Sequence, residues 1–98
     1  MQVFEVRKTD EFVRWLDGLR DVRARARVLV RIERVVAGNL GDSKSVGQGV
    51  SELRIEYGPG YRVYFTRRGQ WIVILLVGGD KSGQAADIKT AIRLAKNL

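Results

Sequence analysis

An uninterrupted apolar stretch, residues 71–77, constrains the fold of this chain more than any other segment. It is far shorter than the roughly 20 residues that a membrane-spanning helix needs. It also lacks the alternation of apolar and polar side chains that is typical of a strand with one face in water. We therefore expect residues 70–77 to form a central strand of a sheet, covered on both faces.

The rest of the chain divides into segments with strand or helix periodicity. Alternating segments precede the apolar stretch, and other segments carry apolar residues at helical spacing after the capping residues Thr9 and Asp21. The expected elements, in chain order, are a strand at 3–6, helices at about 10–19 and 22–37, a Gly- and Ser-rich loop at 38–49, strands at 50–57, 61–66 and 70–77, and a helix at about 84–97. This order, β-α-α-β-β-β-α, predicts one α+β domain over residues 1–98, with the helices packed on one face of a mainly antiparallel sheet.

The composition sets the electrostatic character of the protein and excludes several kinds of site. In 98 residues there are 18 Lys and Arg against 11 Asp and Glu, a net charge of +7. This excess favours an anionic partner such as nucleic acid, an anionic membrane or an acidic protein, although a basic protein can also simply be soluble. The absence of cysteine and histidine excludes disulfides, Cys/His zinc sites, cysteine nucleophiles and Ser-His-Asp triads. We expect neither a metal nor a cofactor.

The N-terminal residues, 1–8, do not show the basic-then-apolar order of a signal peptide. The longest apolar stretch is too short to span a bilayer, so we expect no membrane partner. The sequence therefore predicts a soluble protein of the cytoplasm.

The expected hairpin turns through a three-residue loop, 58–60, and its register brings charged side chains together. It pairs Glu56 with Arg62 and Arg54 with Tyr64. All four, together with Glu52, lie on the sheet face that the helices leave uncovered, where Arg54 and Arg62 are diagonal neighbours. Two arginines with a tyrosine between them can clamp a phosphate. The alternative is a solvated face with cross-strand Arg–Glu pairs, which stabilise little.

A row of arginines follows one side of the second expected helix, opposite its apolar side. The row consists of Arg23, Arg27, Arg31 and Arg34. The simplest interpretation is a solvated helix face, and the functional one is contact with RNA or the docking of an acidic partner. The further candidates for RNA or partner binding are Glu56, Arg67 and Arg68.

Residues 78–82, Gly-Gly-Asp-Lys-Ser, are similar to the end of a phosphate-binding P-loop but do not meet its spacing. That motif needs a glycine directly before its lysine and another five residues earlier, where this chain has Asp80 and Leu75. Asp80 and Asp87 could bind a metal, but carboxylates at the start of a helix are more often caps.

Four segments, residues 52–55, 58–65, 78–82 and 87–89, together carry a family resemblance. They read Glu-Leu-Arg-Ile, Gly-Pro-Gly-Tyr-Arg-Val-Tyr-Phe, Gly-Gly-Asp-Lys-Ser and Asp-Ile-Lys. In this pattern the chain resembles the HigB/RelE-type toxins of bacterial and phage toxin–antitoxin modules, in the branch called addiction module killer proteins. The resemblance extends over essentially the whole chain and implies the RelE/ParE fold. RelE-type members cleave messenger RNA on the ribosome, whereas ParE-type members poison DNA gyrase.

The resemblance also implies partners and site residues. The partners are the ribosome, messenger RNA and a cognate antitoxin with a helix-turn-helix fold. Arg62 matches the arginine that follows Gly-Tyr in the RelE pattern, while Arg54 and Lys81 lie near basic positions of the pattern. The C-terminal tyrosine or histidine of many RelE-like nucleases has no counterpart here, which leaves the general base open. A gyrase toxin of the ParE kind and a plain nucleic-acid-binding module are the alternatives.

The expected reaction is metal-independent cleavage of RNA, in which the 2′-hydroxyl attacks the adjacent phosphate and a 5′-hydroxyl end leaves. Arginines can neutralise the phosphate oxygens, but their pKa above about 12 prevents them from accepting the 2′ proton. Lys81 is the candidate base or acid, with Tyr64, Tyr61 and Glu56 as substitutes. We expect the ribosome to align the substrate, which lowers the barrier further.

Overall fold

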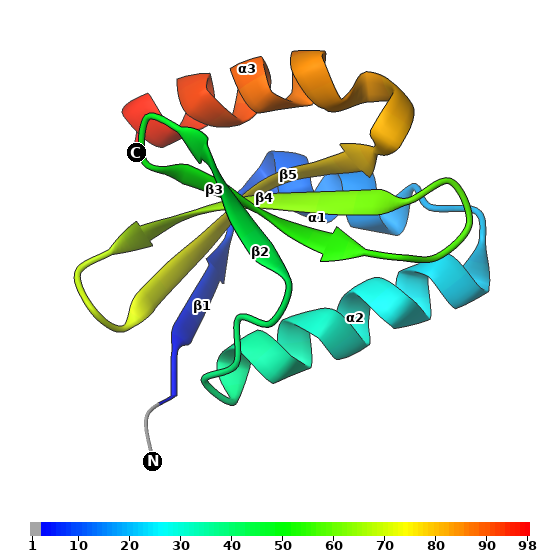
Figure 1. Ribbon diagram of the computed structural model, residues 1–98, viewed down its shortest axis with the longest axis horizontal. Helices are drawn as coiled ribbons and strands as arrows, with labels where there is room; N and C mark the ends of the chain where they lie inside the picture. The colour runs from blue at the N-terminus through cyan, green and yellow to red at the C-terminus, as the bar shows by residue number, and fades with distance from the viewer. Residues whose placement is uncertain (1–2) are drawn as a thin grey trace.

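A five-stranded mixed sheet lies at the centre of the protein, with helices over both of its faces (Figure 1). The computed structural model describes residues 3–98. The elements, in chain order, are β1 (Glu5–Lys8), α1 (Asp10–Asp17), α2 (Val22–Val36), β2 (Ser43–Gly47), β3 (Val50–Ile55), β4 (Tyr61–Arg68), β5 (Ile72–Asp80), the short 3₁₀ helix η1 (Lys81–Gly83) and α3 (Gln84–Lys96). The strands are ordered β1-β5-β4-β3-β2, and only the β1–β5 pair is parallel within residues 3–98.

Strand β5 is the element that the apolar stretch predicted. It has a partner on each side, β1 and β4. Val73 and Leu75 pack into the core formed with α1 and α2, whereas Ile74 and Leu76 pack into a second core under α3. The prediction of an interior strand covered on both faces is confirmed.

The expectation that all helices cover one face is wrong, because α3 packs on the opposite face from α1 and α2 (Figure 1). The physical reason lies in β5: the alternate residues Ile74 and Leu76 need cover, and Ala91 and Leu94 of α3 supply it. Tyr64, expected on a free face, is fully buried there. The α+β class itself is confirmed.

The loop expected at 38–49 contains an additional strand, β2, which pairs with β3. Its Gly- and Ser-rich composition carries no apolar alternation, so the pattern gave no indication of a strand. Gly47, Gln48 and Gly49 all have positive φ and turn the chain directly into β3. The first strand, expected at 3–6, begins and ends later, at Glu5–Lys8.

The β3–β4 register differs from the expected one. Arg54 lies directly opposite Arg62, and Glu52 lies opposite Tyr64. The loop, residues 56–60, is longer than expected: Tyr57 N–H donates to Ile55 O and Gly60 N–H donates to Tyr57 O, each at 3.0 Å, and β3 ends at Ile55, so Glu56 lies outside the ladder. The observed pairing is therefore shifted from the expected one by two residues, since Arg54 pairs with Arg62 instead of Tyr64. Because the shift is even, every side chain stays on its expected face.

The helix caps form as expected. The Thr9 hydroxyl accepts from Phe12 N–H at 3.0 Å, and Asp21 Oδ1 accepts from Arg23 N–H at 2.9 Å. Gly18 ends α1. No helix within residues 3–98 has the length and apolar character needed to cross a bilayer.

The close approach of α1 to β5 at Gly78 makes a prediction about stability. A Cβ at Gly78 would lie 2.3 Å from carbons of the Trp15 ring. We expect Gly78→Ala to destabilise the fold by about 1–3 kcal/mol, because the indole or the strand must move. Urea unfolding followed by circular dichroism measures the change.

A double-mutant cycle supplies the control. In a Trp15→Ala background the Gly78→Ala change has room, and its cost should fall below about 0.5 kcal/mol. Equal costs in the two backgrounds would contradict the contact.

Candidate functional site

Glu52 is a buried carboxylate that joins β3, β4 and α3. Its side chain is only 1% exposed. Arg54 Nε donates to Glu52 Oε1 at 3.1 Å, and Gln84 Nε2 donates to Glu52 Oε2 at 3.0 Å. Arg62 Nε lies 3.7 Å from Glu52 Oε2. The sequence analysis placed Glu52 on an exposed face and did not identify it as the carboxylate that joins the two arginines. The one indication in the sequence was that Glu52 shares a strand face with both of them.

The shared carboxylate holds the two arginines side by side. Two guanidinium groups on opposite strand positions would repel, and the carboxylate between them offsets that repulsion. Because Glu52 faces the Nε atom of each arginine, the terminal nitrogens of Arg54 and Arg62 are left for other acceptors. Arg62 Nη1 donates to Tyr61 O at 3.2 Å. The Arg54 side chain is 33% exposed and that of Arg62 12%.

Arg62 and Lys81 line one concavity of about 330 Å³, together with the loop 56–60. The backbone joins the two sides, since Lys81 N–H donates to Gly60 O at 2.8 Å. Gly60 has a φ of +82°, and a Cβ there would lie 3.8 Å from the Lys81 side chain. Glu56 is exposed and lines the same concavity, so a carboxylate and two cations surround one space.

Arg54 lines a different and larger hollow. This groove, of about 890 Å³, lies between α2 and β3 and is called the α2–β3 groove below. Glu56 and Tyr57 line both the groove and the concavity. The structure therefore brings Arg54 and Arg62 together through Glu52. Separately, it brings Arg62 and Lys81 together around the concavity.

The two tyrosines expected as substitutes for the general base are both buried. Tyr64 is fully buried, and its hydroxyl has no hydrogen-bond partner among residues 3–98. Desolvation, with smaller contributions from Glu52 and Asp87, raises the pKa of Tyr64 to about 12. Burial likewise raises the pKa of Tyr61. Neither phenol is placed to touch a substrate or to lose its proton at neutral pH.

The two aspartates at the end of β5 and the start of α3 have structural contacts. Asp80 Oδ1 accepts from Ser82 N–H at 2.9 Å, and its bonds to Ser82 lower the pKa of Asp80. Asp87 lies against Gly79, where a Cβ would come within 2.0 Å of Asp87 Oδ2. Burial, and then the nearby Asp80, raises the pKa of Asp87. Within residues 3–98 no three His, Cys, Asp or Glu side chains are grouped to hold a metal.

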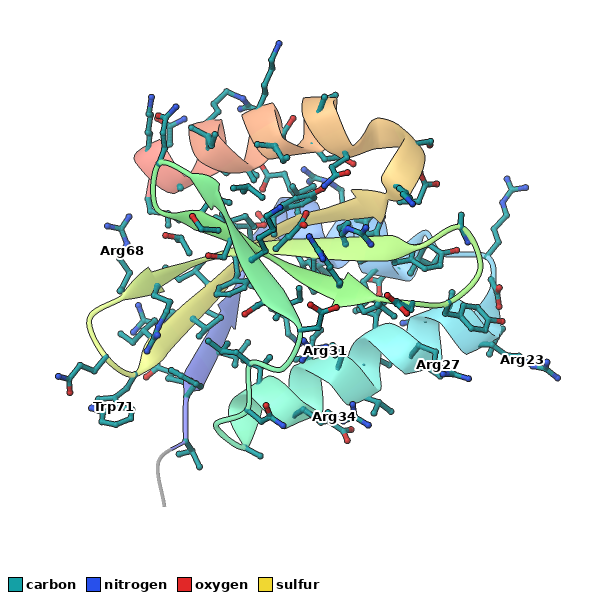
Figure 2. The ribbon with its side chains drawn as sticks, in the orientation of Figure 1. Arg23, Arg27, Arg31, Arg34, Arg68 and Trp71 are labelled. Atoms are coloured by element: carbon teal, nitrogen blue, oxygen red, sulfur yellow. The ribbon has the colours of Figure 1, made fainter. Side chains whose placement is uncertain are left out.

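The arginine row on α2 lines the α2–β3 groove, and its members follow the helix from Arg23 at its start to Arg34 near its end (Figure 2). Arg31 is buried, and its Nη2 donates to Leu40 O and, at 3.0 Å, to Asp42 O. Burial, and then Arg34, lowers the pKa of Arg31. Arg31 thus fixes the segment that leads into β2, while Arg23, Arg27 and Arg34 stay exposed.

Arg68 lies at the far end of β4 from Arg62 (Figure 2), and Arg67 precedes it in the same strand, so neither joins the site. The Arg67 guanidinium lies 4.9 Å from the centre of the Phe4 ring and donates to Gln70 O at 2.9 Å. Arg68 Nη2 donates to Ala95 O at 3.2 Å, near the C-terminus of α3. Both side chains have structural contacts there.

Residues 14–98 match the family model described as "Phage derived protein Gp49-like". The chain belongs to this family. Gp49-like proteins are toxins of toxin–antitoxin modules, so membership indicates that role at this coarse level. The chain is also 49% identical over 94 residues to a Haemophilus influenzae protein named only as an uncharacterized protein, covering 96% of this chain and 95% of that one.

The buried phenol of Tyr64 leads to a prediction about this Gp49-like protein. Its hydroxyl is desolvated without a hydrogen-bond partner, so Tyr64→Phe should leave stability unchanged or raise it by about 1 kcal/mol at neutral pH. Thermal and urea unfolding of the purified variant measure the difference. A loss of more than about 1 kcal/mol would show that the hydroxyl has a stabilising partner.

The raised pKa of Tyr64 predicts a pH dependence with a definite sign. Its folded pKa of about 12 lies above the ordinary value of 10.0, so the neutral phenol favours the folded state. That contribution is complete below pH 10 and is lost as the pH rises to about 12. Over this window the wild type should lose about 2–3 kcal/mol more than Tyr64→Phe. Parallel losses in the two proteins would contradict the shift.

Proposed function

We propose that this Gp49-like protein is a toxin of the HigB/RelE kind that cleaves messenger RNA on the ribosome. The observation that carries the proposal is the concavity in which Arg62, Lys81 and Glu56 meet, with Arg54 joined to Arg62 through Glu52. Cations around a space open to a phosphate, with a carboxylate beside them, are what phosphodiester cleavage without a metal requires. The family's toxin role agrees with it.

Arg62 and Arg54 would bind the phosphate. Glu52 lies against the Nε atom of each arginine, so their terminal nitrogens can donate to the non-bridging oxygens, where negative charge grows in the transition state. Glu52 would act as a positioning residue, because it restricts both guanidinium groups before the substrate arrives. The charge of the three groups together is positive, so a phosphate is still attracted.

Proton transfer falls to Glu56 and Lys81 because both tyrosines are buried. The Glu56 carboxylate would accept the proton of the 2′-hydroxyl as its oxygen forms a bond to phosphorus. The Lys81 ammonium would donate a proton to the 5′ oxygen as the bond from phosphorus to that oxygen breaks. The products are a 2′,3′-cyclic phosphate and a 5′-hydroxyl end, and no oxidant or further reactant is needed.

The proposal includes the partners that the resemblance implied. The ribosome would align the messenger RNA, which compensates for a small set of catalytic groups. A cognate antitoxin would neutralise the protein in the cytoplasm. The whole chain, residues 1–98, would act as one toxin domain, without a metal or cofactor in the reaction.

Arg62→Ala tests the phosphate-binding role. We expect it to lower messenger cleavage by between about tenfold and a thousandfold, because it removes a donor from the transition state. Arg62→Lys should restore only part of the rate, since an ammonium keeps the positive charge but lacks the planar pair of donors with which a guanidinium binds two phosphate oxygens. Primer extension on translated messages after induction measures cleavage, with Arg93→Ala on the exposed side of α3 as the control.

Stability needs its own control, because Arg62 is more buried than the sequence indicated. Removing it leaves Glu52 with one cation fewer and should cost about 1–3 kcal/mol. The double variant Glu52→Gln/Arg62→Ala removes the carboxylate charge as well and should regain part of that loss without regaining cleavage. A folded Arg62→Ala protein that cleaves at the wild-type rate would overturn this assignment, and growth arrest through gyrase without cleavage would favour the ParE-like alternative.

Glu56→Gln tests the general base. Glu56 is exposed, so we expect a stability change within about 0.5 kcal/mol. Cleavage should fall by about a hundredfold or more, because an amide cannot accept the 2′ proton, while binding to ribosomes stays unchanged. Single-turnover cleavage and co-sedimentation with ribosomes separate the two effects. Cleavage by Glu56→Gln at the wild-type rate would exclude Glu56 as the base.

A further inference from the structure

Helix α2 has a second stripe of side chains besides the one that packs in the core. Ala24, Val28, Ile32 and Val35 are buried against the sheet. The stripe that lines the α2–β3 groove, at spacings of three and four residues, consists of Arg23, Ala26, Arg27, Val30, Arg31 and Arg34. Within this stripe Arg31 is buried and bonded to backbone carbonyls, whereas the other five side chains are exposed.

The α2–β3 groove is basic at its rim and apolar in its floor. Five arginines line it, the four of the α2 row and Arg54, against only two carboxylates, Asp42 and Glu56. Ala26, Val30 and Ile55 supply an aliphatic floor, and Val30 is 47% exposed although it is apolar. Basic side chains beside an unoccupied apolar floor fit a ligand that is both acidic and apolar.

The floor favours a peptide over RNA as the occupant. RNA without base pairing binds on aromatic rings against which its bases stack. Here the Arg27 guanidinium already lies over the single aromatic ring of the groove, that of Tyr57, at 5.2 Å from its centre. An amphipathic segment could place apolar residues on Val30 and Ile55 and carboxylates on the exposed arginines.

We infer that the α2–β3 groove binds an acidic, amphipathic peptide segment of the antitoxin, an inference that rests on the proposed toxin function. Arg54 and Glu56 line the groove, and Glu56 also lines the concavity beside Arg62 and Lys81. A segment in the groove therefore lies beside Arg54 and next to the groups that would perform cleavage. Neutralisation then comes from occupation of a surface adjoining the site.

Binding of defined probes tests the chemistry directly. The probes are a two-heptad peptide of Glu and Leu at helical spacing, the same composition in scrambled order, and an oligouridylate of similar length. The helical peptide should bind the wild type at least about tenfold more tightly than the scrambled one. Fluorescence anisotropy at two salt concentrations measures each affinity.

Matched variants separate the groove from general charge. Arg23→Glu/Arg27→Glu should weaken peptide binding by at least about tenfold, whereas Lys89→Glu/Arg93→Glu, the same charge change on exposed α3 positions, should weaken it far less. Val30→Ser should weaken binding of the peptide and not of the oligouridylate. Equal losses in both double variants, or a larger loss for RNA than for the peptide, would overturn the inference.

Growth assays separate this inference from the proposed function. Arg23→Glu/Arg27→Glu should remain toxic when expressed alone and should escape neutralisation by the cognate antitoxin, whereas Lys89→Glu/Arg93→Glu should be neutralised. Full neutralisation of the groove variant would overturn the inference and leave the toxin function standing. A wild type that is not toxic would overturn the proposed function. The probe affinities would then be the only test of whether the groove binds an acidic, amphipathic peptide.

Discussion

The arrangement of the site depends on one buried carboxylate. Two arginines on opposite positions of neighbouring strands repel each other, and burying them adds a cost of desolvation. Glu52 offsets both effects because one of its oxygens accepts from Arg54 and the other faces Arg62. The same carboxylate accepts from Gln84, so the first turn of α3 is held over the β3–β4 hairpin. The positions of the cations therefore follow from the packing of three elements.

Local patterns were sufficient where the physical cause is local. The apolar stretch predicted β5 because an interior strand needs apolar side chains on both faces, and Thr9 and Asp21 predicted two helix starts because a cap bonds to N–H groups a few residues away. Strand β2 was missed because its extended conformation comes from its ladder with β3 and not from its own residues. The side of the sheet on which α3 packs was missed for a similar reason: both faces of β5 are apolar.

The candidate site was predicted in part, because the error in the expected strand register was an even number of residues. The loop 56–60 is longer than the expected turn, which shifts the ladder by an even number of residues and leaves Arg54 and Arg62 on one face. Their proximity could therefore be predicted although their pairing could not. The burial of Tyr64 and Glu52 depends on α3, which is distant in sequence from β3 and β4, so alternation alone placed both residues in solvent. The roles of the site residues stay predictions.

Several of the arginines that contribute to the net charge of +7 make contacts within the structure. Arg31 and Arg68 donate to backbone carbonyls, and Arg54 and Arg62 share a carboxylate. Exposed arginines remain on one side of α2, Arg62 and Lys81 line the concavity, and the loop 56–60 lies between the two hollows. Because this loop borders both hollows, a ligand in either one changes the electrostatic field in the other. Under the proposed function, recognition of the antitoxin and binding of a phosphate would therefore be coupled through the same short loop, without a change in fold.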